Sequence, residues 1–266
     1  MRPFFALIVV CSALNLFALQ IPKSSGQTAS AAVAAQPALP AITFSSVGPV
    51  ASVQMTGTAN WTFGSDQQTG TVTLQANANG QSRILLQLPS GSRSEVQNPF
   101  ANSHRQCTWS GADAVVHTSA VHHCWIDAIW FLPPITMQTG AGASDDVASV
   151  VQLFDTSKIR IHRERHLVDV DSAQTSQFIA HLSAVDLDLD SASGLPVLLT
   201  YAAHPDNDAG VDIGVEIHYS AYQSFSGVTV PTHIQKFINH SLVLDLQISS
   251  VQVQLASAAA SPTSAN

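Results

Sequence analysis

Hydrophobic and polar residues alternate along most of this chain. The clearest case is residues 185–190 (VDLDLD), where three aliphatic residues alternate with three aspartates. Residues 53–63 and 211–219 follow the same period of two. Because successive side chains of a β-strand point to opposite faces of a sheet, this pattern indicates strands with one buried face and one face in water. Over these stretches it excludes amphipathic helices, whose apolar residues recur every three or four positions.

The alternating segments follow one another closely, as antiparallel strands joined by hairpins do. In the last segment the apolar residues change phase between Ile248 and Val251, so Ser249 and Ser250 are predicted to form a β-bulge that bends the strand. We therefore predict a mainly β fold. Its expected form is a single curved antiparallel sheet, a half-barrel, with short helices on the concave side.

Two stretches depart from the alternation and predict those helices. Residues 146–154 place four apolar residues at helical spacing after Asp145 and Asp146, which suits a short capped helix. Residues 119–131, which end just before Pro133, predict a second short helix. Both stretches lie between the first and second sets of strands, so we expect them to fill the concave side.

The beginning of the chain indicates export. Arg2 precedes an uncharged, largely apolar run of sixteen residues at positions 4–19 (FFALIVVCSALNLFAL), which is typical of a secretory signal peptide. We predict a signal peptide over residues 1–31, with cleavage between residues 26 and 34, and a mature protein in the periplasm or extracellular space. A membrane-spanning helix needs about twenty apolar residues, so no stable transmembrane segment is expected after processing.

Composition divides the rest of the chain into one domain and two flexible ends. Residues 32–41 and 257–266 are rich in Ala, Pro and Ser and are predicted to be a flexible leader and a disordered tail. Residues 42–256 contain no linker-like break and are predicted to form a single β-rich domain. With 45% hydrophobic and 11% charged residues the chain can bury a core, and a net charge of −8 argues against a nucleic-acid partner.

Short motifs near the C-terminus carry a resemblance. They resemble the closing hairpins of half-barrel proteins similar to the periplasmic lipoprotein carriers and receptors. In the first half, Trp61, Gly70 and Arg83, together with the CTW and HCW triplets, resemble uncharacterised exported bacterial proteins that share both blocks. The C-terminal motifs are residues 194–196 (GLP), 219–222 (YSAY), 227–231 (GVTVP) and 234–239 (IQKFIN).

The resemblance implies an exported ligand-binding or carrier-like protein for a hydrophobic molecule such as a lipid or acyl chain. Alternatives from other classes are a structural or interaction protein of the envelope and a histidine-dependent extracytoplasmic hydrolase. The residues expected to line the concave face are Val185, Leu187, Leu189, Val211, Ile213, Val215, Ile217, Leu244 and Leu246.

Two cysteines remain after removal of the signal peptide, Cys107 and Cys124. In an oxidising compartment an even pair predicts a disulfide. The alternative is a metal site in which Cys124 joins the adjacent His122 and His123. Zinc needs four convergent ligands, and neither a CxxC nor an HxxxH spacing supplies them around these residues, so we assign no metal.

The remaining polar segments have structural interpretations. Residues 158–166 (KIRIHRERH) alternate as a strand does, and their basic face is expected to lie opposite the aspartates of residues 185–190. Residues 204–212 are predicted to form a polar turn rather than a calcium loop, because the closing Glu of an EF-hand is absent and Asp residues suit turns. The motifs of serine hydrolases, zinc peptidases and phosphate-binding loops are absent from the sequence. We assign no catalytic residue and no cofactor.

Overall fold

The structure is a computed structural model of the chain. It describes Ser45 and residues 49–101, 104–126, 131–132, 146–153, 157–166 and 172–256. Every described residue belongs to one compact unit, Pro37–Asn266. The predicted signal peptide, leader and tail therefore lie outside the described residues.

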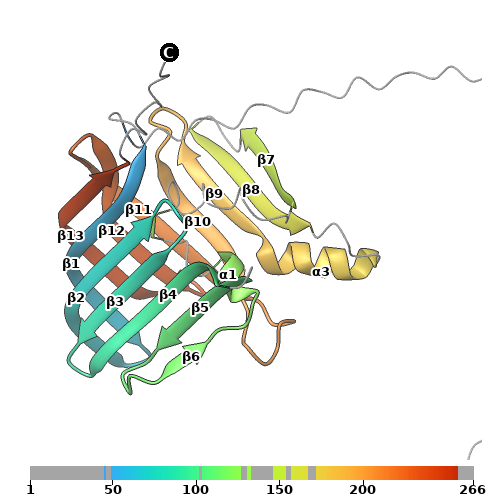
Figure 1. The fold of residues 1–266 in the computed structure, drawn as a ribbon, viewed down its shortest axis with the longest axis horizontal. Coiled ribbons are helices and arrows are strands. Elements are labelled where there is room, and N and C mark those ends of the chain that lie inside the picture. The colour runs from blue at the N-terminus through green and yellow to red at the C-terminus, as the bar shows by residue number, and fades with distance from the viewer. Residues whose placement is uncertain are drawn as a thin grey trace, which may run out of the picture. The chain divides into compact units, whose positions relative to one another are not determined.

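A single antiparallel sheet of thirteen strands dominates the described part of the chain (Figure 1), which confirms the predicted fold class. The strand order is β6-β5-β4-β3-β2-β1-β13-β12-β11-β10-β9-β8-β7. The first set is β1 (Val50–Phe63), β2 (Asp66–Asn77), β3 (Ser82–Leu88), β4 (Gly91–Ala101), β5 (His104–Ser110) and β6 (Val116–Thr118). The second set is β7 (Asp146–Leu153), β8 (Lys158–His166), β9 (Val185–Asp190), β10 (Pro196–Ala203), β11 (Ile213–Phe225), β12 (Val228–Ile238) and β13 (Ser241–Leu255).

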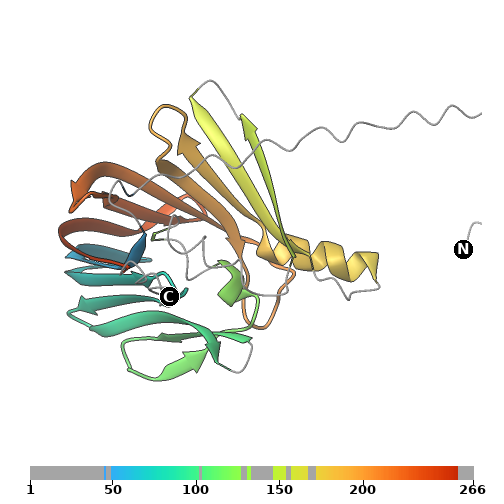
Figure 2. The same ribbon diagram turned by 45° about the horizontal axis from the view of Figure 1, so that its top comes forward.

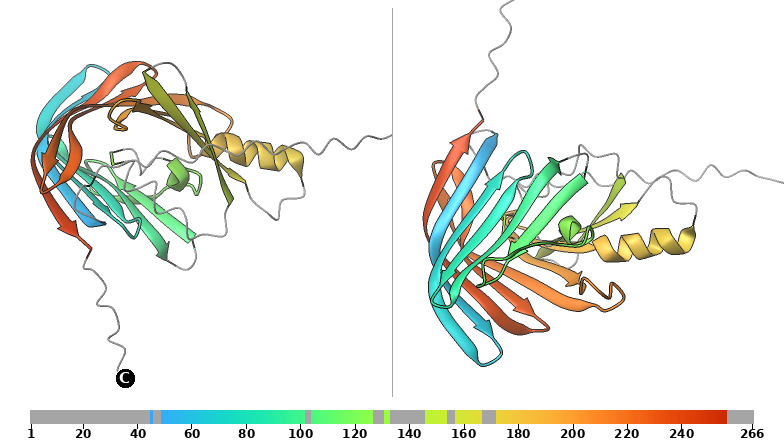
Figure 3. Two further views of the ribbon diagram at one scale, coloured as in Figure 1. Left: turned by 90° about the horizontal axis from the view of Figure 1, so that it is seen from above. Right: turned by 60° about the horizontal axis from the view of Figure 1, so that its bottom comes forward.

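The pairing of the first strand with the last determines how the chain crosses the sheet. Because β1 pairs with β13, the two sets meet in the middle of the strand order, and β6 and β7 stand at its opposite ends. The connection between them contains α1 (His123–Ile126), which packs against β5 and β10 on the inner side of the curved sheet (Figure 3). A short helix within residues 119–131 is thus confirmed on the concave side.

Apolar side chains in cross-strand rows form the core on this inner face. Phe131 and Leu132, which follow α1 along the chain, are buried in the same core cluster as the rows. Burial of each large aliphatic side chain contributes about 1.5–3 kcal/mol. One row runs through directly opposed residues of six strands, namely Leu187, Leu199, Ile217, Lys236, Leu244 and Trp61. The charged member of this row, Lys236, is notable because its neighbours are apolar.

The bulge predicted at Ser249 and Ser250 is confirmed. Thr56 is opposite Ser250 and Gly57 is opposite Ile248, so Ser249 is the extra residue of β13. Its hydroxyl donates a hydrogen bond of 3.3 Å to the Thr56 carbonyl. A Cβ at Gly57 would collide with the backbone of Gln247 on β13, so the close approach of the two strands requires glycine here. Bulges of this kind bend a strand and increase the twist of its sheet.

The helix predicted over residues 146–154 is wrong, because residues 146–153 form strand β7. This strand pairs with β8 from Asp146 opposite His166 to Leu153 opposite Ile159. The segment contains three β-branched valines, which favour a strand. A short helix is marginal by itself. The edge of β8, in contrast, supplies backbone partners along the whole segment.

A helix that the alternation analysis did not predict, α3 (Ala173–Ser183), precedes β9 and packs against β8 (Figure 2). Ser172 is its N-cap, and the Ser172 hydroxyl accepts a hydrogen bond of 3.3 Å from the Thr175 backbone N–H. Across the described ranges, no helix has both the length and the apolar character needed to cross a membrane.

The predicted disulfide between Cys107 and Cys124 is confirmed and joins β5 to α1. The two Cα atoms lie 5.4 Å apart. In the chain-entropy model, closing a loop of this size stabilises the fold by about 3 kcal/mol. Since structural disulfides persist in oxidising compartments, the bond indicates an extracytoplasmic protein.

Candidate ligand-binding site

Two adjoining pockets lie on the inner face of the sheet. The first, which we call the tryptophan pocket, has a volume of about 290 Å³. The second, which we call the histidine pocket, has a volume of about 420 Å³. The tryptophan pocket is lined by Trp61, Phe63, Ile84, Leu86, Arg93 and Leu244, among others. The histidine pocket is lined by Cys107, His123, Tyr201, His204, Ile213 and Val215, among others.

Four residues line both pockets and connect them: Glu95, Trp109, Lys236 and Ile238. They come from three strands, β4, β5 and β12, which belong to both sets of the sheet. The two pockets are therefore neighbours along one lining. That lining runs from the aromatic residues at the end of β1 to the loop after β10.

An arginine and two aromatic rings stack at one end of this lining. The guanidinium carbon of Arg93 lies 4.3 Å from the centroid of the Trp61 ring, in cation–π geometry. Trp61 stacks in turn on Phe63, whose side chain is 72% exposed at the rim. The Nε atom of Arg93 is buried and has no hydrogen-bond partner among the described residues.

The strand register turns the charged residues of β4 toward the pockets. Arg93 is directly opposite Leu86, and Glu95 is directly opposite Ile84. Both partners belong to the apolar core, so Arg93 and Glu95 share the inner face with them. Sequence reasoning missed these residues because β4 carries polar residues in both phases, and only the pairing with β3 distinguishes its two faces.

The residues predicted to line the concave face occupy three kinds of position. Leu244 lines the tryptophan pocket, and Ile213 and Val215 line the histidine pocket. Val211 lies in the loop before β11 with 46% of its surface exposed, so the strand expected to begin at this residue begins at Ile213. The other five are buried in the core cluster and line neither pocket, namely Val185, Leu187, Leu189, Ile217 and Leu246.

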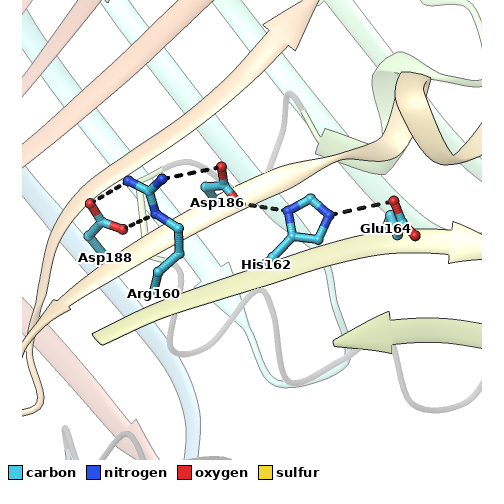
Figure 4. A network of polar contacts seen from close by, with 5 residues as sticks. All are labelled: Arg160, His162, Glu164, Asp186 and Asp188. Atoms are coloured by element: carbon cyan, nitrogen blue, oxygen red, sulfur yellow. Dashed lines mark hydrogen bonds and ion pairs between the residues drawn. The ribbon is translucent and has the colours of Figure 1, made fainter. Parts of the chain in front are cut away.

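The outer face of the sheet carries a separate network of charges between β8 and β9 (Figure 4). Arg160 donates to both carboxylate oxygens of Asp188, from Nε at 2.6 Å and from Nη2 at 2.9 Å. His162 lies 2.7 Å from Asp186 through Nδ1 and 3.5 Å from Glu164 through Nε2. This confirms the prediction that the basic strand face lies opposite the aspartates.

These contacts shift the protonation of the two basic groups. The hydrogen bonds to Asp188 raise the pKa of Arg160 above its ordinary value. Burial acts to lower the pKa of His162, but the hydrogen bonds to Asp186 and Glu164 outweigh it, and the pKa is raised. Each charged group of the network therefore has a hydrogen-bond or ion-pair partner within the network. None of its members is among the residues that line the tryptophan and histidine pockets.

Comparison with known proteins yields similarity only among solved structures. No family model and no curated protein matches the chain. A domain assigned to outer membrane lipoprotein sorting from Vibrio parahaemolyticus is 9% identical, with a TM-score of 0.45, over 76% of this chain and 85% of that one. A LolA superfamily protein from Nitrosomonas europaea is 10% identical, with a TM-score of 0.46, over 80% and 90% of the two chains.

A third solved structure, a DUF1329 family protein from Desulfovibrio piger, is 10% identical, with a TM-score of 0.47, over 77% of this chain and 86% of that one. Proteins of the lipoprotein-carrier class, which the C-terminal hairpins resemble, are thus among the solved structures to which this chain is similar at low identity. Identity at this level transfers no function.

Proposed function

We propose that this protein is an exported binding or carrier protein for an amphiphile, a molecule with an apolar chain and an acidic head group. The observation that carries the proposal is the pair of adjoining pockets, of about 290 and 420 Å³, on the inner face of the sheet. Ligand pockets are concave, mostly apolar and of about 300–1,000 Å³, with a few convergent polar groups. The two pockets together meet this description.

The apolar part of the ligand would lie along the shared lining. Ile84 and Leu86 on β3 and Leu244 on β13 present aliphatic surface to the tryptophan pocket, and Val215 on β11 does so in the histidine pocket. Transfer of each methylene from water to such a surface contributes about 0.8 kcal/mol. A chain of several methylenes therefore supplies a binding energy that does not depend on any single contact.

The head group would lie at Arg93. Its Nε–H is a donor without a partner among the described residues, and its guanidinium carbon lies over the Trp61 ring. A carboxylate or phosphate satisfies such a donor through a charge-assisted hydrogen bond. Within the tryptophan pocket, Arg93, Lys236 and Glu95 together carry a formal charge of about +1, so this pocket favours an anionic group over a cationic one.

The proposal is tested by looking for a bound molecule and by filling the pocket. Protein purified without detergent is expected to carry an amphiphile that mass spectrometry detects after organic extraction, and to bind a fluorescent fatty-acid analogue. Val215→Trp places a large ring in the histidine pocket and is expected to weaken probe binding. The matched control is His218→Trp on the same strand, whose side chain is exposed on the outer face.

Overfilling a core costs about 1–3 kcal/mol, so folding of each variant is checked by circular dichroism. Ile213→Trp fills the same pocket from a half-buried position and keeps the test available if Val215→Trp does not fold. A wild-type protein that carries no amphiphile and binds no probe would overturn the proposal. In that case a structural or interaction role in the envelope becomes the better account.

A further inference from the structure

Two histidines and an aspartate meet beside the histidine pocket, whose lining includes one of them, His204. His181 is in the last turn of α3, and His204 and Asp212 lie at the two ends of the loop between β10 and β11. One ligand atom from each residue lies within 4.8 Å of those of the other two. We propose that this triad binds a divalent transition-metal ion, with Zn²⁺ as the best match.

The donor set and its spacing fit such an ion. Nε2 of His181 lies 2.9 Å from Oδ1 of Asp212, and the His181 and His204 ring centroids are 5.6 Å apart. Around a tetrahedral zinc ion with bonds of about 2.0 Å, neighbouring ligand atoms are about 3.3 Å apart. Small side-chain rotations therefore bring the groups to bonding positions. Two imidazoles with one carboxylate suit zinc and related metals, whereas magnesium and calcium prefer oxygen ligands.

His204 supplies the observation that separates this cluster from an ordinary ion pair. Its side chain is fully buried, and its Nδ1 lies 3.2 Å from the Val211 carbonyl, to which it can donate, and 3.4 Å from Oδ1 of Asp212. Its Nε2 has no hydrogen-bond partner within the part of the chain that the structure describes. Metal-binding histidines are oriented in this way, with one ring N–H on a backbone carbonyl and the other nitrogen on the metal.

A second His–Asp pair in the molecule shows the contrast. His233 and Asp245 lie at the same distance, 2.9 Å from Nε2 to Oδ1. There, however, Nδ1 of His233 contacts the Ser220 hydroxyl at 3.1 Å, so both ring nitrogens are satisfied by protein groups. In the proposed metal site, His181 and Asp212 form an equivalent pair. The buried imidazole of His204 is added to it, and its Nε2 has no hydrogen-bond partner among the described residues.

Zinc titration of the metal-free protein tests the inference. The protein is prepared without a histidine tag, treated with a chelator and titrated with ZnCl₂ by isothermal calorimetry, with MgCl₂ as a parallel probe. We expect one Zn²⁺ per chain and no Mg²⁺. Asp212→Asn and His181→Ala change half-exposed side chains and are expected to weaken zinc binding at least about tenfold, as loss of even an outer partner does.

His233→Ala, which breaks the contrasting pair, is expected to leave zinc affinity unchanged. The inference is overturned if the wild-type protein binds no stoichiometric zinc, or if Asp212→Asn and His181→Ala bind it as tightly as wild type. It is also overturned if binding survives these changes but is lost in His122→Ala, because the ligands would then lie beside α1. The titration contains no lipid, so its outcome is independent of the proposed function.

Discussion

Two arginines on opposite faces of the sheet have different surroundings. On the outer face, Arg160 makes a bidentate pair with Asp188, whose side chain is only 2% exposed. On the inner face, Arg93 lies on the Trp61 ring, and its buried Nε has no hydrogen-bond partner among the described residues. Both positions follow from strand register, since each arginine is directly opposite a residue that determines its environment.

The difference distinguishes a structural charge from a binding charge. A charge that register places against a carboxylate is already satisfied, so it contributes to folding and offers nothing to a ligand. A charge that register places among apolar residues of a pocket retains donor capacity that a ligand can satisfy. Removing the partner of Arg160 should therefore lower stability without affecting ligand binding. Removing Arg93 should weaken ligand binding.

The largest effect is expected at Asp188. Asp188→Ala removes the buried carboxylate of the bidentate pair and leaves Arg160 with Asp186 alone, at 3.8 Å. Loss of one partner of a buried charge pair costs about 3 kcal/mol. Urea unfolding of the variant should show this loss in the free energy of unfolding. Probe binding by the folded variant should remain at the wild-type level. A stable variant that fails to bind the fatty-acid analogue would reverse the assignment of the two faces.

The next effect is expected at Arg93. Arg93→Ala removes the donor proposed for the head group, and a hydrogen bond to a charged group contributes about 1.5–3 kcal/mol, or roughly ten- to a hundredfold in Kd. Fluorescence titration with a fatty-acid analogue measures this change. Arg83→Ala on the neighbouring strand is the matched control, because Arg83 is exposed on the outer face. Equal binding by the two variants would remove Arg93 from the site.

The smallest effect concerns the pH dependence of the outer network. The pKa of His162 is raised in the folded protein, so its contribution to stability is fully present below about pH 6.5 and is lost as the pH rises through the folded pKa. His162 is about one-third exposed, so solvent screening limits the contribution to about 0.5 kcal/mol.

Urea unfolding of wild type and His162→Gln between pH 6 and pH 8 isolates this contribution. The free-energy difference between the two proteins should be larger at pH 6 than at pH 8. Identical pH profiles would show that His162 gains nothing from Asp186 and Glu164.

The sequence contains enough information for the strands but not for the site. Alternation predicted β9 over Val185–Asp190, and the change of phase predicted the bulge at Ser249, because both depend on which face of one strand is buried. The segment of β7 has valines at helical spacing, and only its pairing with β8 shows that it is a strand. Local spacing fits either structure, and the neighbouring strand decides between them.

The pocket and the metal triad could not be predicted because each depends on long-range pairing. Arg93 and Leu244 line one pocket although they belong to strands at opposite ends of the chain. His181, His204 and Asp212 come together only because α3 ends beside the loop between β10 and β11. No spacing rule along the sequence indicates that three such segments meet.

Quenching of tryptophan fluorescence by a brominated fatty acid tests most directly whether the inner face binds an amphiphile. Bromine quenches an indole only at close contact, and Trp61 and Trp109 both line the tryptophan pocket. We predict saturable quenching by a dibrominated stearate, beyond any change caused by stearate itself, that is largely lost in the Trp61→Phe/Trp109→Phe variant. Quenching that is absent, or that is unchanged in the double variant, would contradict the account.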